Sequence, residues 1–165
     1  MTGAFDDLLA ANTDYRREFA LGGFDGVAHA GVAIITCMDS RIDPLGMVGL
    51  KPGDAKIFRN PGGRVTPAAL TAIVLGVHLL GVERVLVVPH TRCAMAVSSE
   101  QELQHRLSER TGTDCSWLSL GTIPDQELAV REDVHKVRAH PLVPDRVQVG
   151  GFLLDVDTGA LRQLA

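Results

Sequence analysis

The sequence has few aromatic residues, few cysteines and no long apolar segment. Phe, Trp and Tyr make up 4% of the 165 residues, and 16 Lys and Arg are dispersed along a chain of net charge −4. Nucleic-acid binding needs a basic stripe or aromatic stacking residues, so we expect no nucleic-acid partner. No apolar run approaches the roughly 20 residues that cross a bilayer, so we expect no membrane role.

Three cysteines, Cys37, Cys93 and Cys115, are too few and odd in number for a disulfide framework. A cytosolic thiol more often binds metal, acts in catalysis or stays free than forms a disulfide. The chain also starts with acidic, amphipathic sequence instead of a basic start followed by an apolar stretch. We therefore expect a cytoplasmic protein with at least one unpaired thiol.

Two short segments, 31–36 and 84–89, are β-branched and almost continuously apolar. This pattern is typical of strands that are buried on both faces of a parallel sheet. Segment 55–60 is a weaker strand candidate. The length fits a single domain over 1–165. We predict an α/β fold with a mostly parallel β-sheet flanked by helices.

The segment between strand candidates 55–60 and 84–89 predicts a crossover helix. Thr66 is a plausible N-cap and Pro67 suits the first helical position, and the sequence then stays apolar to residue 81. We expect this helix to be buried, with His78 in the core. The other expected elements are two polar-faced helices and a C-terminal strand, turn and strand, in segments 98–110, 124–141 and 145–164.

The N-terminal segment 1–21 predicts a helical arm of one or two amphipathic turns, with apolar residues that have no clear place in the core of their own domain. An exposed apolar stripe usually finds a partner. We therefore expect a homodimer or a dimer of dimers. The residues of this stripe are Phe5, Leu8, Leu9 and Tyr15.

A strand, a crossover helix and a parallel strand bring both carboxyl strand ends to one edge of the sheet, where ligands bind. Cys37 follows the first strand, and His90 and Cys93 follow the later one. Two thiolates and one imidazole are a zinc set that leaves a fourth position open for water. Two alternatives remain: buried thiols beside a packed histidine, or a cysteine hydrolase that uses His90 with one of these thiols.

Asp39 lies two residues from Cys37 and two from Arg41, so in an extended stretch all three side chains face one side. Arg41 can hold Asp39 ionised in a bidentate pair. Asp39 would then accept a hydrogen bond from water at the zinc, or become a conditional fourth ligand. The alternative is a salt bridge between Asp39 and Arg41 that only stabilises the end of the strand.

Together, "ITCMDSR", "GDAKIFRNPGG" and "VVPHTRCAM" resemble the β-class carbonic anhydrases, most closely their short bacterial and archaeal clade. The similarity covers nearly the whole chain. It implies Cys37, His90 and Cys93 as zinc ligands and Asp39 with Arg41 as the catalytic dyad. The implied reaction is the reversible hydration of CO2 to bicarbonate and a proton. The implied assembly is a dimer in which the N-terminal helix of each subunit packs against the partner subunit.

The sequence departs from the family pattern beside the second cysteine, where Arg92 and Ala94 replace the usual Asp and Gly. The Cβ of Ala94 crowds a backbone N–H that in the family faces bicarbonate, so Ala94 is a candidate substrate-binding residue. Val65 and Met95 are apolar candidates for admitting CO2. The departures leave open hydrolysis of COS or CS2 by the same zinc chemistry, or a zinc- and bicarbonate-binding protein with little turnover.

Overall fold

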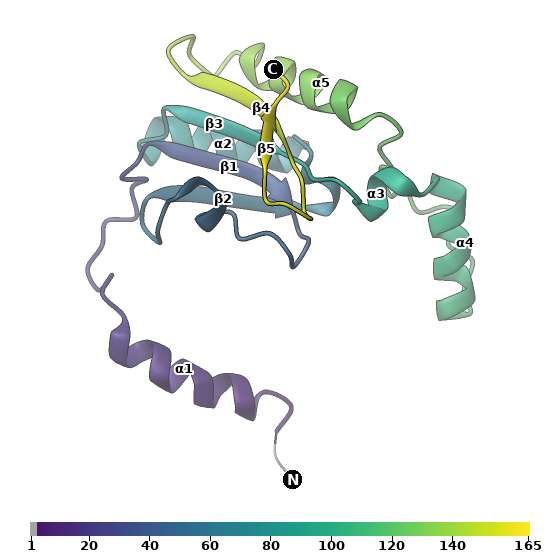
Figure 1. Ribbon diagram of the computed structural model, residues 1–165, viewed down its shortest axis with the longest axis horizontal. Helices are drawn as coiled ribbons and strands as arrows, with labels where there is room; N and C mark the ends of the chain where they lie inside the picture. Colours follow the sequence, from purple (N-terminus) through teal and green to yellow (C-terminus); the bar gives the residue numbers. More distant parts are fainter. Residues whose placement is uncertain (1–2) are drawn as a thin grey trace.

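The computed structural model describes residues 3–165 and contains one five-stranded sheet in the order β2-β1-β3-β4-β5 (Figure 1). The first four strands of this order run parallel, and β5 pairs antiparallel with β4. The α/β prediction with a mostly parallel sheet is therefore confirmed. The strands are β1 (Val32–Cys37), β2 (Ala55–Asn60), β3 (Arg84–Val88), β4 (Gln148–Leu154) and β5 (Leu161–Gln163).

Five α-helices and two short 3-10 helices accompany the sheet within the described residues. Helices α2 and α5 pack on the same sheet face, where Ile73 and Val134 share one apolar core with Ile35 and Val87. On the other face, the core includes Ile34. The helices are α1 (Asp6–Glu18), α2 (Pro67–Leu79), α3 (Ala94–Val97), α4 (Glu100–Thr111) and α5 (Gln126–Arg138), with η1 (Gly46–Val48) and η2 (Pro61–Gly63).

The central elements form where their sequence patterns predict them. All six residues of β1 are buried, as expected for an apolar strand in the middle of a parallel sheet. Helix α2 begins with Thr66, whose side chain accepts a hydrogen bond from the N–H of Ala69, and Pro67 follows at the first helical position. The crossover from β2 through α2 to β3 therefore follows the predicted course.

Helix α2 is less buried than predicted. Leu75 and Leu79 remain 48% and 69% exposed. The prediction of a core histidine was wrong, because His78 is exposed and its Nε2 lies 2.8 Å from the carbonyl oxygen of Leu142. A helix on one sheet face buries a single stripe, and in this almost wholly apolar sequence only Thr71 and His78 mark the exposed side.

Helix α1 is longer than the predicted one or two turns, with 13 residues in the segment predicted as the 1–21 arm. Residues 1–2 of that arm lie outside the described residues, and the domain bounds 1–165 stay a prediction. No residue of α1 is buried. Figure 1 shows the helix standing away from the sheet, at the end of a connecting segment. The large apolar side chains of this region are exposed: Phe5, Leu8, Leu9, Tyr15 and Phe19.

No helix within residues 3–165 has the length and apolar character needed to cross a bilayer.

Candidate metal centre

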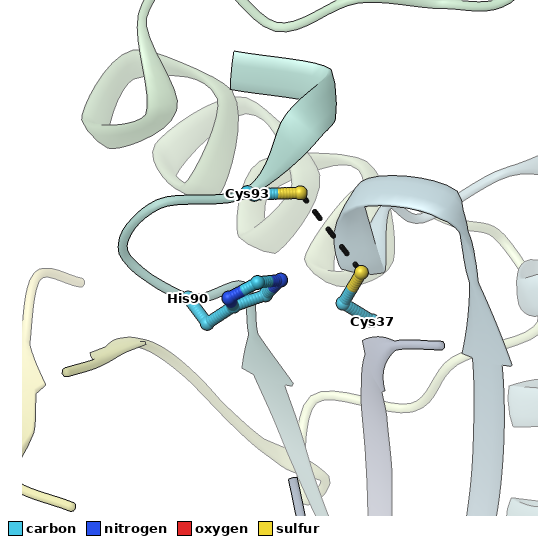
Figure 2. Close-up of side chains that lie close together, drawn as sticks. All are labelled: Cys37, His90 and Cys93. Carbon is cyan, nitrogen blue, oxygen red and sulfur yellow. Dashed lines mark hydrogen bonds between the residues drawn. The ribbon is translucent and has the colours of Figure 1, made fainter. Parts of the chain in front are cut away.

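Three residues from two neighbouring strand ends converge at the carboxyl edge of the sheet. Cys37 is the last residue of β1, His90 lies two residues beyond β3, and Cys93 is the N-cap of α3. Because β1 and β3 are parallel neighbours, their ends bring these residues together. Each offers one ligand atom, and these atoms all lie within 4.8 Å of one another (Figure 2).

The spacing of the two sulfurs fits a single zinc ion. The Sγ atoms of Cys37 and Cys93 are 3.9 Å apart. Zinc–sulfur bonds of about 2.3 Å in a tetrahedral arrangement place two sulfurs about 3.8 Å apart. Both cysteines are buried, and all three cysteines of the chain are free thiols. The pair therefore has the geometry of two metal ligands without any movement of the backbone.

The imidazole of His90 is completely buried, and its Nε2 has no hydrogen-bond partner. Its Nδ1 lies 2.8 Å from the carbonyl oxygen of Thr91. A carbonyl only accepts hydrogen bonds, so Nδ1 carries the proton and Nε2 keeps a free lone pair. Buried polar atoms are rarely left unpaired, and a zinc ion bound by Nε2 satisfies this one. The donor set therefore fits zinc.

The two thiols share their protons unequally in the metal-free chain. A hydrogen bond from Cys93 lowers the pKa of Cys37; burial opposes this, while His90 and the backbone N–H groups of Asp39 and Gly62 reinforce it. The same hydrogen bond and burial raise the pKa of Cys93. The site thus favours one thiolate before any metal arrives, and a bound cation favours ionisation of the second thiol.

Asp39 and Arg41 form a bidentate ion pair beside these residues. The Nε of Arg41 donates to Oδ1 of Asp39 at 2.9 Å, and Nη2 donates to Oδ2 at 2.7 Å. The side-chain hydrogen bond from Arg41, followed by its backbone N–H, holds the pKa of Asp39 well below its usual range. Oδ2 is 3.7 Å from Nε2 of His90. An ionised carboxylate therefore borders the space that faces the imidazole.

The local conformation that creates this pair differs from the predicted extended stretch. Strand β1 ends at Cys37, and the next residues form a turn in which the N–H of Ile42 donates to the carbonyl of Asp39 at 3.1 Å. The backbone N–H of Arg41 also donates to Oδ1 of Asp39 at 2.9 Å. The turn, and not strand alternation, brings the guanidinium back to the carboxylate.

A cavity of about 430 Å³ opens onto the ligand group and the dyad. Of the predicted substrate-binding residues, Ala94 and Met95 line it. Val65 instead lies in the core that α2 covers and does not line this cavity. The remaining lining residues, which the sequence analysis did not identify, are Met38, Ser40 and Pro61.

Arg92, which departs from the family pattern, does not line the cavity. Its backbone φ is +54°, the one positive value at a non-glycine residue within the described part of the chain. Its guanidinium pairs with Asp157, in the turn between β4 and β5. With Arg92 at this position, the three ligand atoms still lie within 4.8 Å of one another.

Two residues that support the ligands were not found from the sequence. The side-chain amide of Gln126 donates to the carbonyl of His90 at 2.9 Å, and Arg59 donates to the carbonyl of Cys37 at 2.8 Å. Gln126 is separated from His90 by 36 residues, and no motif spacing connects them. Arg59 lies within "IFRNPGG", where only the strand register shows which carbonyl it reaches.

Comparisons with known proteins agree with this geometry. Residues 32–122 match the family model described as carbonic anhydrase. The chain is 31% identical over 159 residues to "Beta-carbonic anhydrase 1" of Mycobacterium tuberculosis, with 96% of each chain covered. A crystal structure of carbonic anhydrase from Streptococcus mutans superposes with a TM-score of 0.89 at 32% identity and covers 100% of this chain and 99% of that one.

A "Carbon disulfide hydrolase" of Acidithiobacillus thiooxidans is also similar, with 28% identity over 151 residues that cover 78% of this chain and 74% of that protein. A second "Carbon disulfide hydrolase" of the same organism is 30% identical over 176 residues that cover 92% of this chain and 81% of that protein. The resemblance predicted from the three sequence motifs is confirmed. The chain belongs to the β-carbonic anhydrase family.

Proposed function

We propose that this protein is a zinc enzyme, a lyase that catalyses the reversible hydration of CO2 to bicarbonate and a proton. One observation carries the proposal. Two buried sulfurs 3.9 Å apart and an unpartnered imidazole nitrogen converge where a cavity meets an ionised carboxylate. Ordinary packing would leave that nitrogen unsatisfied, whereas a metal centre uses all three ligand atoms.

Cys37, His90 and Cys93 would hold the zinc. When bound by three protein ligands, zinc lowers the pKa of a water molecule in the fourth position and so supplies a nucleophile at neutral pH. The Thr91 carbonyl keeps the His90 proton on Nδ1, and Gln126 holds the His90 carbonyl. These contacts would orient the ring before metal binding, as outer-shell hydrogen bonds do in metalloproteins.

Asp39 would orient the reacting water by accepting a hydrogen bond through Oδ2. That oxygen lies 3.7 Å from Nε2 of His90, so it borders the space next to the ligand atoms. The bidentate contact with Arg41 fixes the carboxylate and keeps it ionised. Asp39 would become the fourth zinc ligand only if this pair opened; the closed pair supports a site that is open to water.

The cavity suits a small neutral substrate. Met38, Pro61, Ala94 and Met95 line it with apolar surface next to the ligand atoms. CO2 carries no charge and few hydrogen-bonding groups, so apolar walls would admit it, and the charged product would leave for water. Val65 is a buried core residue and is not among the residues that line the cavity.

Hydrolysis of CS2 or COS is a second candidate. Like CO2, both are linear molecules with an electrophilic carbon, and a similar protein is named "Carbon disulfide hydrolase". The 96% coverage of both chains in the comparison with a β-carbonic anhydrase and the TM-score of 0.89 against a solved carbonic anhydrase support CO2 as the first candidate. Stopped-flow hydration of CO2, measured beside COS and CS2 hydrolysis on the same metal-verified preparation, separates these substrates. Absence of turnover with all three would indicate a zinc- and bicarbonate-binding protein.

We also propose that the protein is a homodimer or a dimer of dimers in the cytoplasm. Helix α1 exposes Leu8 and Leu9 at 62% and 65%, and it has no buried residue. A second copy is the proposed partner for this apolar helix. The free thiols support a cytoplasmic location because thiols stay reduced there. Light scattering at micromolar concentration and cell fractionation test these two statements.

Elemental analysis tests the metal assignment. We expect about one zinc per chain in the purified wild-type protein. Cys37→Ser and Cys93→Ser should each lose most of the zinc, because each removes one of three ligands. Cys115→Ser is the matched control, since Cys115 is a free thiol outside the ligand group. Equal zinc content in all three variants contradicts the assignment.

A further inference from the structure

We propose that Arg59 is a positioning residue of the metal centre, which holds the backbone of residues 37–42 so that Cys37 and Asp39 face the same cavity. The inference rests on the proposed function, because it assigns a role in building that zinc site. Arg59 does not line the cavity and supplies no ligand atom. It would therefore act on the metal and the dyad only through the loop that carries them.

The strand register places Arg59 beside the loop. Arg59 is the second-last residue of β2, and it pairs with Thr36 just before β1 ends. From there its guanidinium donates to three backbone carbonyls. Nε reaches Cys37 at 2.8 Å, Nη2 reaches Asp39 at 2.5 Å, and Nη1 reaches Ile42 at 3.3 Å.

These bonds replace the strand ladder at the point where the chain must turn. Beyond Cys37, the N–H of Met38 still donates to the carbonyl of Asn60 at 3.1 Å, and then the ladder with β2 stops. The next carbonyls require other partners. Because Arg59 binds these carbonyls on one side of the loop, the loop curves. In the resulting loop, Oδ2 of Asp39 lies 3.7 Å from Nε2 of His90.

The contacts explain why an arginine, and not a lysine, occupies this position. A guanidinium is a rigid planar fork with five N–H donors, so one side chain can reach three carbonyls in fixed directions. Among the described residues, Arg17, Arg41, Arg64, Arg92 and Arg162 form ion pairs with carboxylates, and Arg59 forms none. All of its side-chain hydrogen bonds go to this loop.

Arg84 provides a matched control on the same sheet. Its Nη2 donates to the carbonyl of Ala30 at 2.9 Å, so it also binds backbone of the segment that contains β1. Arg84 pairs with Val32 at the beginning of β1, at the other end of the strand from Cys37. Removing Arg84 therefore tests the loss of an arginine–carbonyl contact without disturbing the metal loop.

The test measures zinc affinity of the full-length protein by competition with a chromophoric chelator, together with the visible spectrum after cobalt substitution. Arg59→Gln should weaken zinc binding about 10- to 100-fold, the range seen when outer-shell partners are removed. It should also change the cobalt ligand-field bands, because the Cys37 sulfur and the Asp39 carboxylate lose their fixed geometry. Arg84→Gln should match the wild type in both measurements.

Arg59→Lys keeps the positive charge and should bind zinc more tightly than Arg59→Gln. If Arg59→Gln does not fold, Arg59→Lys is measured in its place. Wild-type affinity and spectrum in the substituted protein would overturn the inference, as would equal losses in the Arg59 and Arg84 variants. These outcomes differ from a failure of the proposed function. If the wild-type protein bound no zinc, both proposals would fall; if it bound zinc but did not hydrate CO2, only the proposed reaction would fall.

Discussion

Replacing Asp133 by Asn should lower the free energy of unfolding by about 3–5 kcal/mol, the cost of breaking a buried ion pair. The Asp133 side chain is 1% exposed. Its carboxylate accepts hydrogen bonds from Arg64 Nε at 2.6 Å, the Val65 N–H at 2.9 Å and Lys136 Nζ at 2.7 Å. An amide turns one acceptor into a donor among donors and leaves the part-buried Arg64 without that counter-charge.

Thermal unfolding at a fixed protein concentration measures this loss. With an unfolding entropy near 2.1 cal/mol/K per residue, a chain of 165 residues gives about 0.35 kcal/mol/K, so the midpoint should fall by about 9–14 °C. The control is Asp157→Asn, since Asp157 forms a solvent-exposed ion pair with Arg92. An exposed pair contributes less than about 1 kcal/mol. Equal small losses in both variants would refute the reasoning.

The pH dependence gives a second check on Asp133. Burial raises the pKa of this carboxyl, but hydrogen bonds from Arg64, Lys136 and the Val65 N–H outweigh burial and hold the pKa below its usual value. Its stabilising contribution is therefore complete above the unfolded value near pH 4 and is lost as pH falls through the lower folded value. The stability difference between wild type and Asp133→Asn should stay constant above about pH 5 and shrink in acid.

Three further substitutions test the dyad, the N-terminal helix and the loop behind the metal centre. Arg41→Ala should keep zinc while CO2 hydration falls and its pH profile moves to higher pH, because the freed carboxylate competes with water for the ion; an unchanged profile rules out the dyad. Leu9→Asp should yield monomers by light scattering, and an unchanged oligomer contradicts the proposed role of α1. Gly63→Ala should lose both stability and zinc, since its Cβ would lie 2.9 Å from the backbone N of Cys37. Gly159→Ala, also at positive φ but with open space around it, should cost only about 1–2 kcal/mol and keep zinc.

The sheet and its crossover could be predicted because a parallel strand buried on both faces has a short, almost continuously apolar sequence. Every residue of β1 is apolar or small enough to be enclosed, and Thr66 with Pro67 marks the start of α2. The extent of burial around α2 was not predictable in the same way. Its sequence is almost wholly apolar, and only Thr71 and His78 marked the side that is exposed together with Leu75 and Leu79.

The ligand group was predictable because parallel strand ends meet at one edge, whatever the detailed register. That topology brings Cys37, His90 and Cys93 together, and their residue types and the family resemblance indicate zinc ligands. The hydrogen bonds of Gln126 and Arg59 to the backbone of the ligand residues depend on details that the topology does not specify. Gln126 reaches His90 only because α5 starts beside the ligand turn, and Arg59 reaches its carbonyls because β2 and β1 pair in one particular register.

Stopped-flow measurement of CO2 hydration on zinc-verified wild-type protein, before and after removal of the metal with a chelator, tests the central claim most directly. The account predicts hydration well above the buffer rate with about one zinc per chain, its loss on metal removal, and its recovery when zinc is returned. A protein that carries zinc and hydrates CO2 no faster than buffer would contradict the claim.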